Sequence, residues 1–275
     1  MLIEKTFDTS TVKLNYVEGP PSGPPLVLLH GFSDNWRSLS LLLPFLLPRW
    51  QVYALDSRGH GKSGHPGTYT LGALATDTSA FLEGVVGQPA AIMGMSQGGL
   101  VGIRVAARFP QGVRALVVGD SPLYRETLTE WWKNVTTPEA RARRSKTKEL
   151  IRAKSSVKSI ALELVEQFPQ MDAAWLRYVA KSYTQLDPEI FAFLDQEHPE
   201  TFLDEVDSSA YLLKITCPVL LLQSALMTLD DGQRALKQLP DGYLVHFDNM
   251  GHLLHLESQG YQVIATVSHF LESLL

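Results

Sequence analysis

The stretch that decides the fold is Gly94-Met95-Ser96-Gln97-Gly98. It follows the apolar run 90–94 and opens the segment 98–109, in which apolar residues recur at helical spacing. A G-x-S-x-G pattern between a buried strand and a helix is typical of a sharp turn that raises the serine hydroxyl above the end of a sheet. The glycines leave room for so tight a turn, and the N-terminus of the helix favours negative charge that develops beside it. Ser96 is therefore a candidate nucleophile.

On either side of this turn, short apolar runs alternate with helical patterns. Runs of strand length lie at 26–30, 52–56, 90–94, 115–119, 218–222 and 243–247. Helical spacing is found at 35–47, 71–86, 98–109, about 230–239 and about 258–274. Continuous apolar runs fit strands that are buried on both faces, as in a parallel sheet. Two further stretches, 2–7 and 11–17, predict an antiparallel hairpin at the sheet edge. The fold class is therefore α/β, with a mostly parallel eight-stranded sheet flanked by helices.

The segment 122–214 differs from the rest of the chain. It has no apolar run of buried-strand type, and its helical patterns are rich in aromatic residues. We predict a helical cap (lid) domain, 122–214, inserted after the sixth strand of a core domain formed by 1–121 and 215–275. A cap over the carboxyl ends of the strands would cover the place where open α/β sheets bind ligands. Trp131 and Trp132 are its tentative substrate-pocket residues, with core packing as the alternative.

Composition and charge exclude several classes of protein. The 275 residues are 45% hydrophobic and 19% charged, values that argue against a disordered or fibrous chain. The net charge of −5 gives no reason to expect nucleic acid or an anionic membrane as a partner. A cluster of eight basic residues against Glu149 gives 141–158 a local charge of +7, which we interpret as a solvated helix face. The single cysteine, Cys217, cannot form an intrachain disulfide. With no signal-peptide pattern and no apolar run long enough to span a bilayer, we expect a cytoplasmic protein.

A nucleophilic serine needs a base and donors for the developing oxyanion. His252 follows the last predicted strand, which makes it the best-placed base, and His255 is the alternative. The expected oxyanion-hole residues are Gln97, directly after the serine, and Phe32, in the loop after the third strand, each through its backbone N–H. We interpret His30 as a structural residue that holds this loop.

Four pieces of the chain together resemble the α/β-hydrolase fold superfamily, in particular its capped, serine esterase-like members. The pieces are His30-Gly31-Phe32, the loop Asp56–Gly64, the Ser96 turn and Gly251-His252. They occur in the family's order and spacing, so the resemblance extends over essentially the whole chain. It implies that Ser96 and His252 act with a carboxylate as a catalytic triad.

The position of that carboxylate departs from the family's common pattern. Family members usually follow the seventh strand with Gly-x-x-Asp, but here Ser224 stands at the glycine and Met227 at the aspartate. Some relatives carry the acid after the sixth strand instead, where this chain has Asp120. We favour Asp120, with Asp231 and Asp230 as alternatives. Thr228 and Asp231 have the spacing of a helix cap, which offers Asp231 a structural role.

Serine at the turn selects among the chemistries of the fold. The resemblance implies an aspartate there for epoxide hydrolases and dehalogenases, whereas serine suits acyl transfer. The predicted function is cleavage of a small-molecule carboxylic ester. Lactonase, thioesterase or perhydrolase (cofactor-free haloperoxidase-like) activity on the same triad remains open, as does a hydroxynitrile-lyase-like enzyme or a small-molecule receptor.

No cofactor and no metal are expected. The run Gly59–Gly64 imitates a dinucleotide fingerprint, but His65-Pro66-Gly67 follows it where such a fingerprint would enter a helix. No group of cysteine, histidine and acidic residues has metal-ligand spacing. The oligomeric state stays open.

Overall fold

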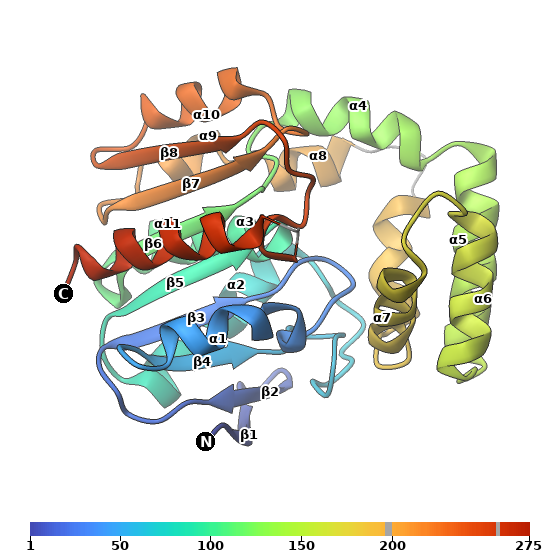
Figure 1. The fold of residues 1–275 in the computed structure, drawn as a ribbon, viewed down its shortest axis with the longest axis horizontal. Coiled ribbons are helices and arrows are strands. Elements are labelled where there is room, and N and C mark those ends of the chain that lie inside the picture. Colours follow the sequence, from blue (N-terminus) through green and yellow to red (C-terminus); the bar gives the residue numbers. More distant parts are fainter. Residues whose placement is uncertain (196–199, 257–258) are drawn as a thin grey trace.

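The computed structural model describes residues 1–195, 200–256 and 259–275. Its centre is an eight-stranded sheet in the order β1-β2-β4-β3-β5-β6-β7-β8 (Figure 1). The strands are β1 (Ile3–Asp8), β2 (Lys13–Glu18), β3 (Pro25–Leu29), β4 (Gln51–Leu55), β5 (Ala90–Met95), β6 (Val113–Gly119), β7 (Val219–Ser224) and β8 (Gly242–Phe247). β1 pairs antiparallel with β2, and β2 with β4, while the remaining neighbours are parallel. The predicted sheet and its edge hairpin are therefore confirmed.

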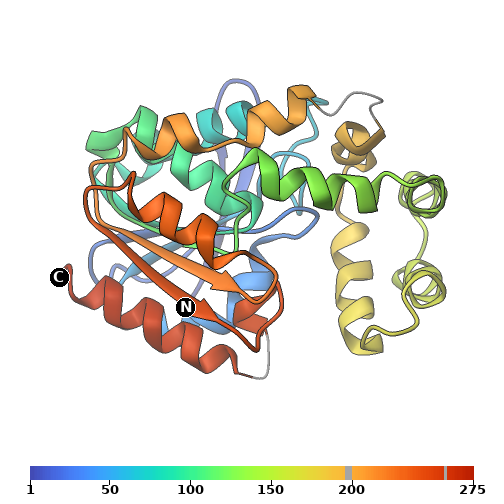
Figure 2. The same ribbon diagram turned by 90° about the horizontal axis from the view of Figure 1, so that it is seen from above.

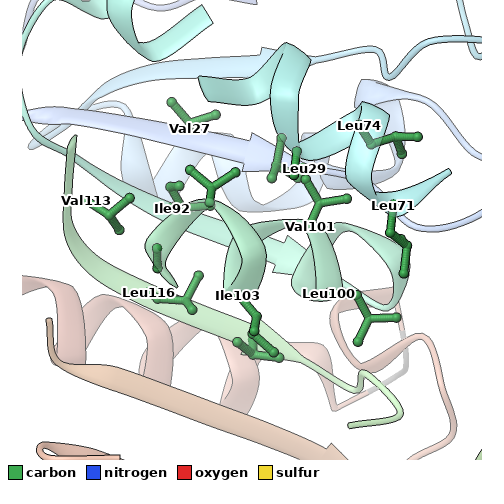
Figure 3. Packing of buried hydrophobic residues seen from close by; sticks show 14 of the residues in the cluster. Val27, Leu29, Leu71, Leu74, Ile92, Leu100, Val101, Ile103, Val113 and Leu116 are labelled. Atoms are coloured by element: carbon green, nitrogen blue, oxygen red, sulfur yellow. The ribbon is translucent and has the colours of Figure 1, made fainter. Parts of the chain in front are cut away.

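Helices cover both faces of the sheet because the inner strands are apolar on both faces. Within β3, Val27 and Leu29 belong to one buried cluster, and Leu26 and Leu28 belong to another. The first cluster includes residues of α2 (Leu71–Phe81), α3 (Gln97–Arg108) and α10 (Leu229–Leu236), and Figure 3 shows part of this packing. The second includes residues of η1 (Trp36–Leu42), α1 (Leu43–Leu46) and α11 (Gly260–Glu272).

Two of the predicted helices are not continuous α-helices. The expected helix at 35–47 divides into the 3₁₀ helix η1 and the short helix α1, with Pro44 in the first turn of α1. Proline has no N–H to continue the hydrogen-bond ladder from the preceding turn, which explains the division. The expected helix at 71–86 ends as α-helix at Phe81 and continues as the π-helical turn η2 (Leu82–Val86). The predicted start of the last helix, Ser258, lies outside the described residues.

Between β6 and β7 the chain forms a helical insertion. Its elements are α4 (Arg125–Val135), α5 (Pro138–Arg152), α6 (Val157–Gln167), α7 (Ala173–Tyr183), η4 (Pro188–Asp195), α8 (Glu200–Val206) and α9 (Ser209–Leu212). Helices α5, α6 and α7 stand beyond the carboxyl ends of the parallel strands, and α4 leads out to them (Figures 1 and 2). Val206 and Leu212 belong to the same buried cluster as Val101 of α3, so α8 and α9 return to the sheet. The division into core and cap domains stays a prediction.

Within the basic run 141–158, Arg144, Lys146, Lys148 and Arg152 form ion pairs. Arg144 and Lys148 both reach Asp195, at 3.0 and 2.7 Å. Lys146 pairs with Glu163 at 2.6 Å, and Arg152 pairs with Glu189. These acidic partners all lie within the insertion, so the run holds α5 against its neighbours, which a merely solvated face would not do. In the described part of the chain, no helix combines the length and apolar character needed to cross a membrane.

Candidate active site

The turn between β5 and α3 places Ser96 at the carboxyl edge of the sheet. Ser96 has φ 51° and ψ −115°, a conformation that residues with side chains rarely adopt. The turn requires glycine on either side. A Cβ on Gly94 would lie 2.2 Å from the Gly98 carbonyl carbon, and one on Gly98 would lie 2.3 Å from the Leu29 oxygen. The Ser96 N–H donates to the Gly119 oxygen at 2.6 Å, which anchors the strained residue to β6.

His252 lies between this serine and Asp120. In the loop after β8, its Nε2 is 3.0 Å from Ser96 Oγ and its Nδ1 is 2.6 Å from Asp120 Oδ2. The Asp120 side chain is fully buried, whereas the His252 ring is 38% exposed. A neutral ring with its proton on Nδ1 donates to the carboxylate and accepts from the serine hydroxyl. The structure thus brings together the three residues that were selected from the sequence.

The alternative acids, Asp231 and Asp230, belong to the first turn of α10. Asp231 lies in the first turn of α10, where its N–H donates to the Thr228 hydroxyl at 3.3 Å, as the capping pattern predicts. Its carboxylate accepts from the Thr127 hydroxyl of α4. Asp230 is exposed. The Asp231 carboxylate is therefore engaged with α4, and the contact with His252 Nδ1 comes from Asp120.

The alternative base, His255, is a buried residue of η5 (Leu254–Leu256), and its Nε2 lies 3.1 Å from the Ser38 oxygen. Burial lowers the pKa of His255 to about 4. This ring is thus held neutral in a structural contact between η5 and η1.

The carboxylate of Asp120 is held by Ser224, a residue for which the sequence predicts no role in the site. Ser224, the last residue of β7, donates its N–H to Asp120 Oδ1 at 2.6 Å and its hydroxyl to Oδ2 at 2.9 Å. The signal in the sequence was the serine that replaces the family's usual glycine. Its meaning depends on the pairing of β6 with β7, which brings Gly119 opposite Leu222.

Of the predicted oxyanion residues, Gln97 directly follows the serine, and Phe32 lies in a loop that passes beside it. Gln97 is the first residue of α3, where a helix has no internal acceptor for the backbone N–H. The loop that carries Phe32 passes close by, because a Cβ on Gly31 would be 3.5 Å from Ser96 Cβ. His30 accepts from the Ser57 N–H at 3.0 Å through Nε2 and contacts the Gly31 oxygen at 2.7 Å through Nδ1. These two contacts fit the loop-holding role expected of His30.

The side chain of Phe32 points into an aromatic cluster of the insertion. Its ring meets those of Phe191 and Phe193 edge to face, each at 5.4 Å between centroids. Trp132 is only 6% exposed and packs against Phe193 and Phe202. Trp131, the other tentative pocket residue, is 41% exposed and is not part of this buried cluster.

A second, polar contact joins the same loop to α7. Tyr178 donates its hydroxyl to Asp34 at 2.9 Å, and Asn35 donates to the Ser182 hydroxyl at 3.2 Å. Burial raises the pKa of Asp34. Asp34 and Asn35, the loop residues in these two contacts, lie only a few residues from Phe32. The contacts with α7 therefore help to set the path of the loop.

The loop Asp56–Gly64 supports the site from the other side. Arg58 and Asp77 form a buried ion pair with contacts of 2.5 and 2.6 Å. Asp56 accepts from the Trp36 N–H at 2.9 Å and the Lys62 N–H at 2.9 Å. Asp56 thus holds backbone N–H groups directly, whereas Asp77 holds the loop through the Arg58 side chain.

Comparison with known proteins shows the family and the fold of this chain. The model of the alpha/beta hydrolase fold family matches residues 24–259. A human serine hydrolase-like protein is 35% identical over 109 residues, which are 38% of this chain and 54% of the relative. The chain therefore spans only about half the length of this human relative. A pimeloyl-[acyl-carrier protein] methyl ester esterase of Chromobacterium violaceum is 26% identical over 92% of this chain and 97% of its own.

The solved structure of an E-2-(acetamidomethylene)succinate hydrolase superposes with a TM-score of 0.74 at 21% identity, and covers 99% of this chain and 100% of that chain. The family match, together with the sheet order, settles the class: the chain belongs to the α/β hydrolase fold family, as its resemblance implied.

Proposed function

We propose that this protein is a serine hydrolase that cleaves carboxylic esters through an acyl-enzyme on Ser96. The observation that carries the proposal is the chain of contacts from Ser96 Oγ through His252 to Asp120, at 3.0 and 2.6 Å. Serine is a weak nucleophile unless a base within hydrogen-bond reach takes its proton. His252 has its acceptor nitrogen at the serine, and Asp120 orients the ring.

In the proposed mechanism, Ser96 Oγ attacks the ester carbonyl as its proton passes to His252 Nε2. The backbone N–H groups of Gln97 and Phe32 stabilise the resulting oxyanion, aided by the N-terminus of α3. His252 then gives the proton to the departing alcohol. A water molecule, activated by the same ring, attacks the acyl-enzyme and releases the acid.

The aromatic cluster supports an apolar group on the substrate. Phe32 directly follows Gly31, which lies beside Ser96, and its ring contacts Phe193, which in turn contacts Trp132. We expect part of the substrate to contact these rings during turnover. Esters, lactones and thioesters share the acyl-transfer chemistry, and a panel varying acyl length, lactone ring size and alcohol bulk separates them.

The test of the mechanism is Ser96→Ala. Wild-type protein should hydrolyse p-nitrophenyl esters and react with a fluorophosphonate, and the variant should do neither above about 10⁻³ of the wild-type rate. Turnover that survives in a folded Ser96→Ala protein would contradict an acyl-enzyme. Cleavage of cyanohydrins without esterase activity would favour the lyase-like alternative, and ligand binding without turnover on any panel member would favour a receptor.

A further inference from the structure

We propose that Ser224 is a positioning residue for the triad, holding the Asp120 carboxylate so that one of its oxygens faces His252. This role rests on the proposed function, because it concerns the same reaction. Ser224 occupies the position at which the family's common pattern has glycine, and a glycine would have no hydroxyl to donate.

Two hydrogen bonds fix the plane of the carboxylate. The Ser224 N–H binds Oδ1 at 2.6 Å and the hydroxyl binds Oδ2 at 2.9 Å, so both oxygens are held from the β7 side. His252 Nδ1 approaches Oδ2 at 2.6 Å. A carboxylate bound at both oxygens cannot rotate about its χ2 angle without breaking a charge-assisted bond.

The direction of the Ser224 hydroxyl is also determined. Its oxygen accepts the Leu226 N–H at 3.1 Å, which occupies a lone pair and leaves the O–H for Asp120. Both Ser224 and Asp120 are fully buried. Water is therefore excluded as an easy replacement for the hydroxyl, and its loss would leave part of the carboxylate's hydrogen-bonding capacity unfilled.

The need for such a partner follows from the backbone of Asp120. Its φ of 44° lies in the left-handed region, which is costly for a residue with a side chain. The Asp120 N–H donates to the Leu222 oxygen at 2.7 Å, so β7 holds both the backbone and the side chain of this residue. Ala225, which follows Ser224 at the end of β7, donates its N–H to the Met250 oxygen at 3.0 Å. This bond ties the loop that carries His252 to the end of β7.

The experiment compares Ser224→Ala and Ser224→Cys with wild-type protein and with Ser208→Ala. Cysteine keeps the size of the side chain but donates only weakly. Ser208 is a fully buried serine of the insertion whose hydroxyl donates to the Val206 oxygen, so its variant reports the general cost of losing a buried hydroxyl. The measurements are the rate of Ser96 labelling by a fluorophosphonate and the separate values of kcat and KM for an ester.

For both Ser224 variants, we expect the rate of fluorophosphonate labelling and kcat to fall about tenfold each. KM should stay within about twofold of the wild-type value. Ser208→Ala should stay within about twofold in all three measurements. A folded Ser224→Ala or Ser224→Cys protein with wild-type labelling and kcat would overturn the role of Ser224 and leave the proposed function intact. A wild-type protein that does not react with the fluorophosphonate would overturn both.

Discussion

At the residue scale, Ser96 and Asp120 are two strained residues that follow neighbouring strands of the sheet. Ser96 directly follows β5 and Asp120 directly follows β6, and both have positive φ. The Ser96 N–H donates to the oxygen of Gly119, the residue that precedes Asp120. Strain of this kind persists only where surrounding contacts determine the conformation, and here the contacts are hydrogen bonds across the sheet edge.

The choice of acid can be tested directly. Asp120→Asn removes the negative charge and favours the wrong tautomer of His252, so we expect kcat to fall about 10³- to 10⁴-fold. Asp231→Asn should leave kcat within about twofold, because that carboxylate contacts Thr127 and the start of α10. Ester hydrolysis by the two purified variants decides the matter. A large loss in Asp231→Asn alone would mean that the acid lies after β7.

At the element scale, the contacts between α7 and the loop 31–35 connect the insertion to the loop that carries the proposed oxyanion donor Phe32. Phe32 donates from this loop in the proposed mechanism, and Asp34 and Asn35 are held by Tyr178 and Ser182. A shift of α7 would therefore move the loop as well. We therefore expect the position of the insertion to affect the geometry of the proposed oxyanion hole.

Tyr178→Phe tests that coupling. The variant removes one donor to a buried carboxylate, and we expect a loss of about 1–3 kcal/mol in the free energy of unfolding. We also expect a lower kcat, since the loop carrying the Phe32 N–H is less firmly held. Tyr261→Phe, at an exposed tyrosine of α11, is the matched control and should change neither quantity. Denaturant unfolding measures the free energy of unfolding, and ester kinetics measure kcat. An unchanged kcat in Tyr178→Phe would mean that the contact with α7 does not affect the proposed oxyanion hole.

At the scale of the whole molecule, two buried histidines make stability depend on pH. Burial lowers the pKa of His60 to about 3 and that of His255 to about 4, from an ordinary value of 6.5. Below pH 6.5 the unfolded chain binds protons at these sites and the folded chain does not. Stability from this source is thus full above pH 6.5 and is lost progressively as the pH falls toward the folded values. Asp34 has the opposite sign, because its raised pKa favours folding below its ordinary 3.8.

We therefore expect the free energy of unfolding to fall between about pH 7 and pH 5, by up to about 1.4 kcal/mol per pH unit for each histidine. His60→Asn retains a donor for the Arg58 oxygen, which His60 contacts at 2.8 Å, but cannot titrate. Its stability should decline less steeply over this range, as measured by urea unfolding at several pH values. Parallel pH dependences in the variant and the wild type would refute the assignment to His60.

The net charge of the chain does not describe the local charge of the insertion. The net charge of −5 conceals the basic run 141–158, in which Arg144, Lys146 and Lys148 pair with acidic residues of the same insertion. The pattern of like charges was visible in the sequence, but its partners were not. Asp195 and Glu163 reach α5 only once the helices have packed.

The sequence by itself determined the strands, most of the helices and the serine turn, because these depend on local pattern: apolar runs, helical spacing and glycines at a tight turn. It also narrowed the base to the loop after the last strand. Only the tertiary structure decided which carboxylate meets His252, since that depends on the pairing of β6 with β7. The same pairing gives Ser224 its partner, and the packing of the insertion separates buried Trp132 from exposed Trp131. Contacts between segments distant in the chain are set by packing and strand order, and no local pattern encodes them.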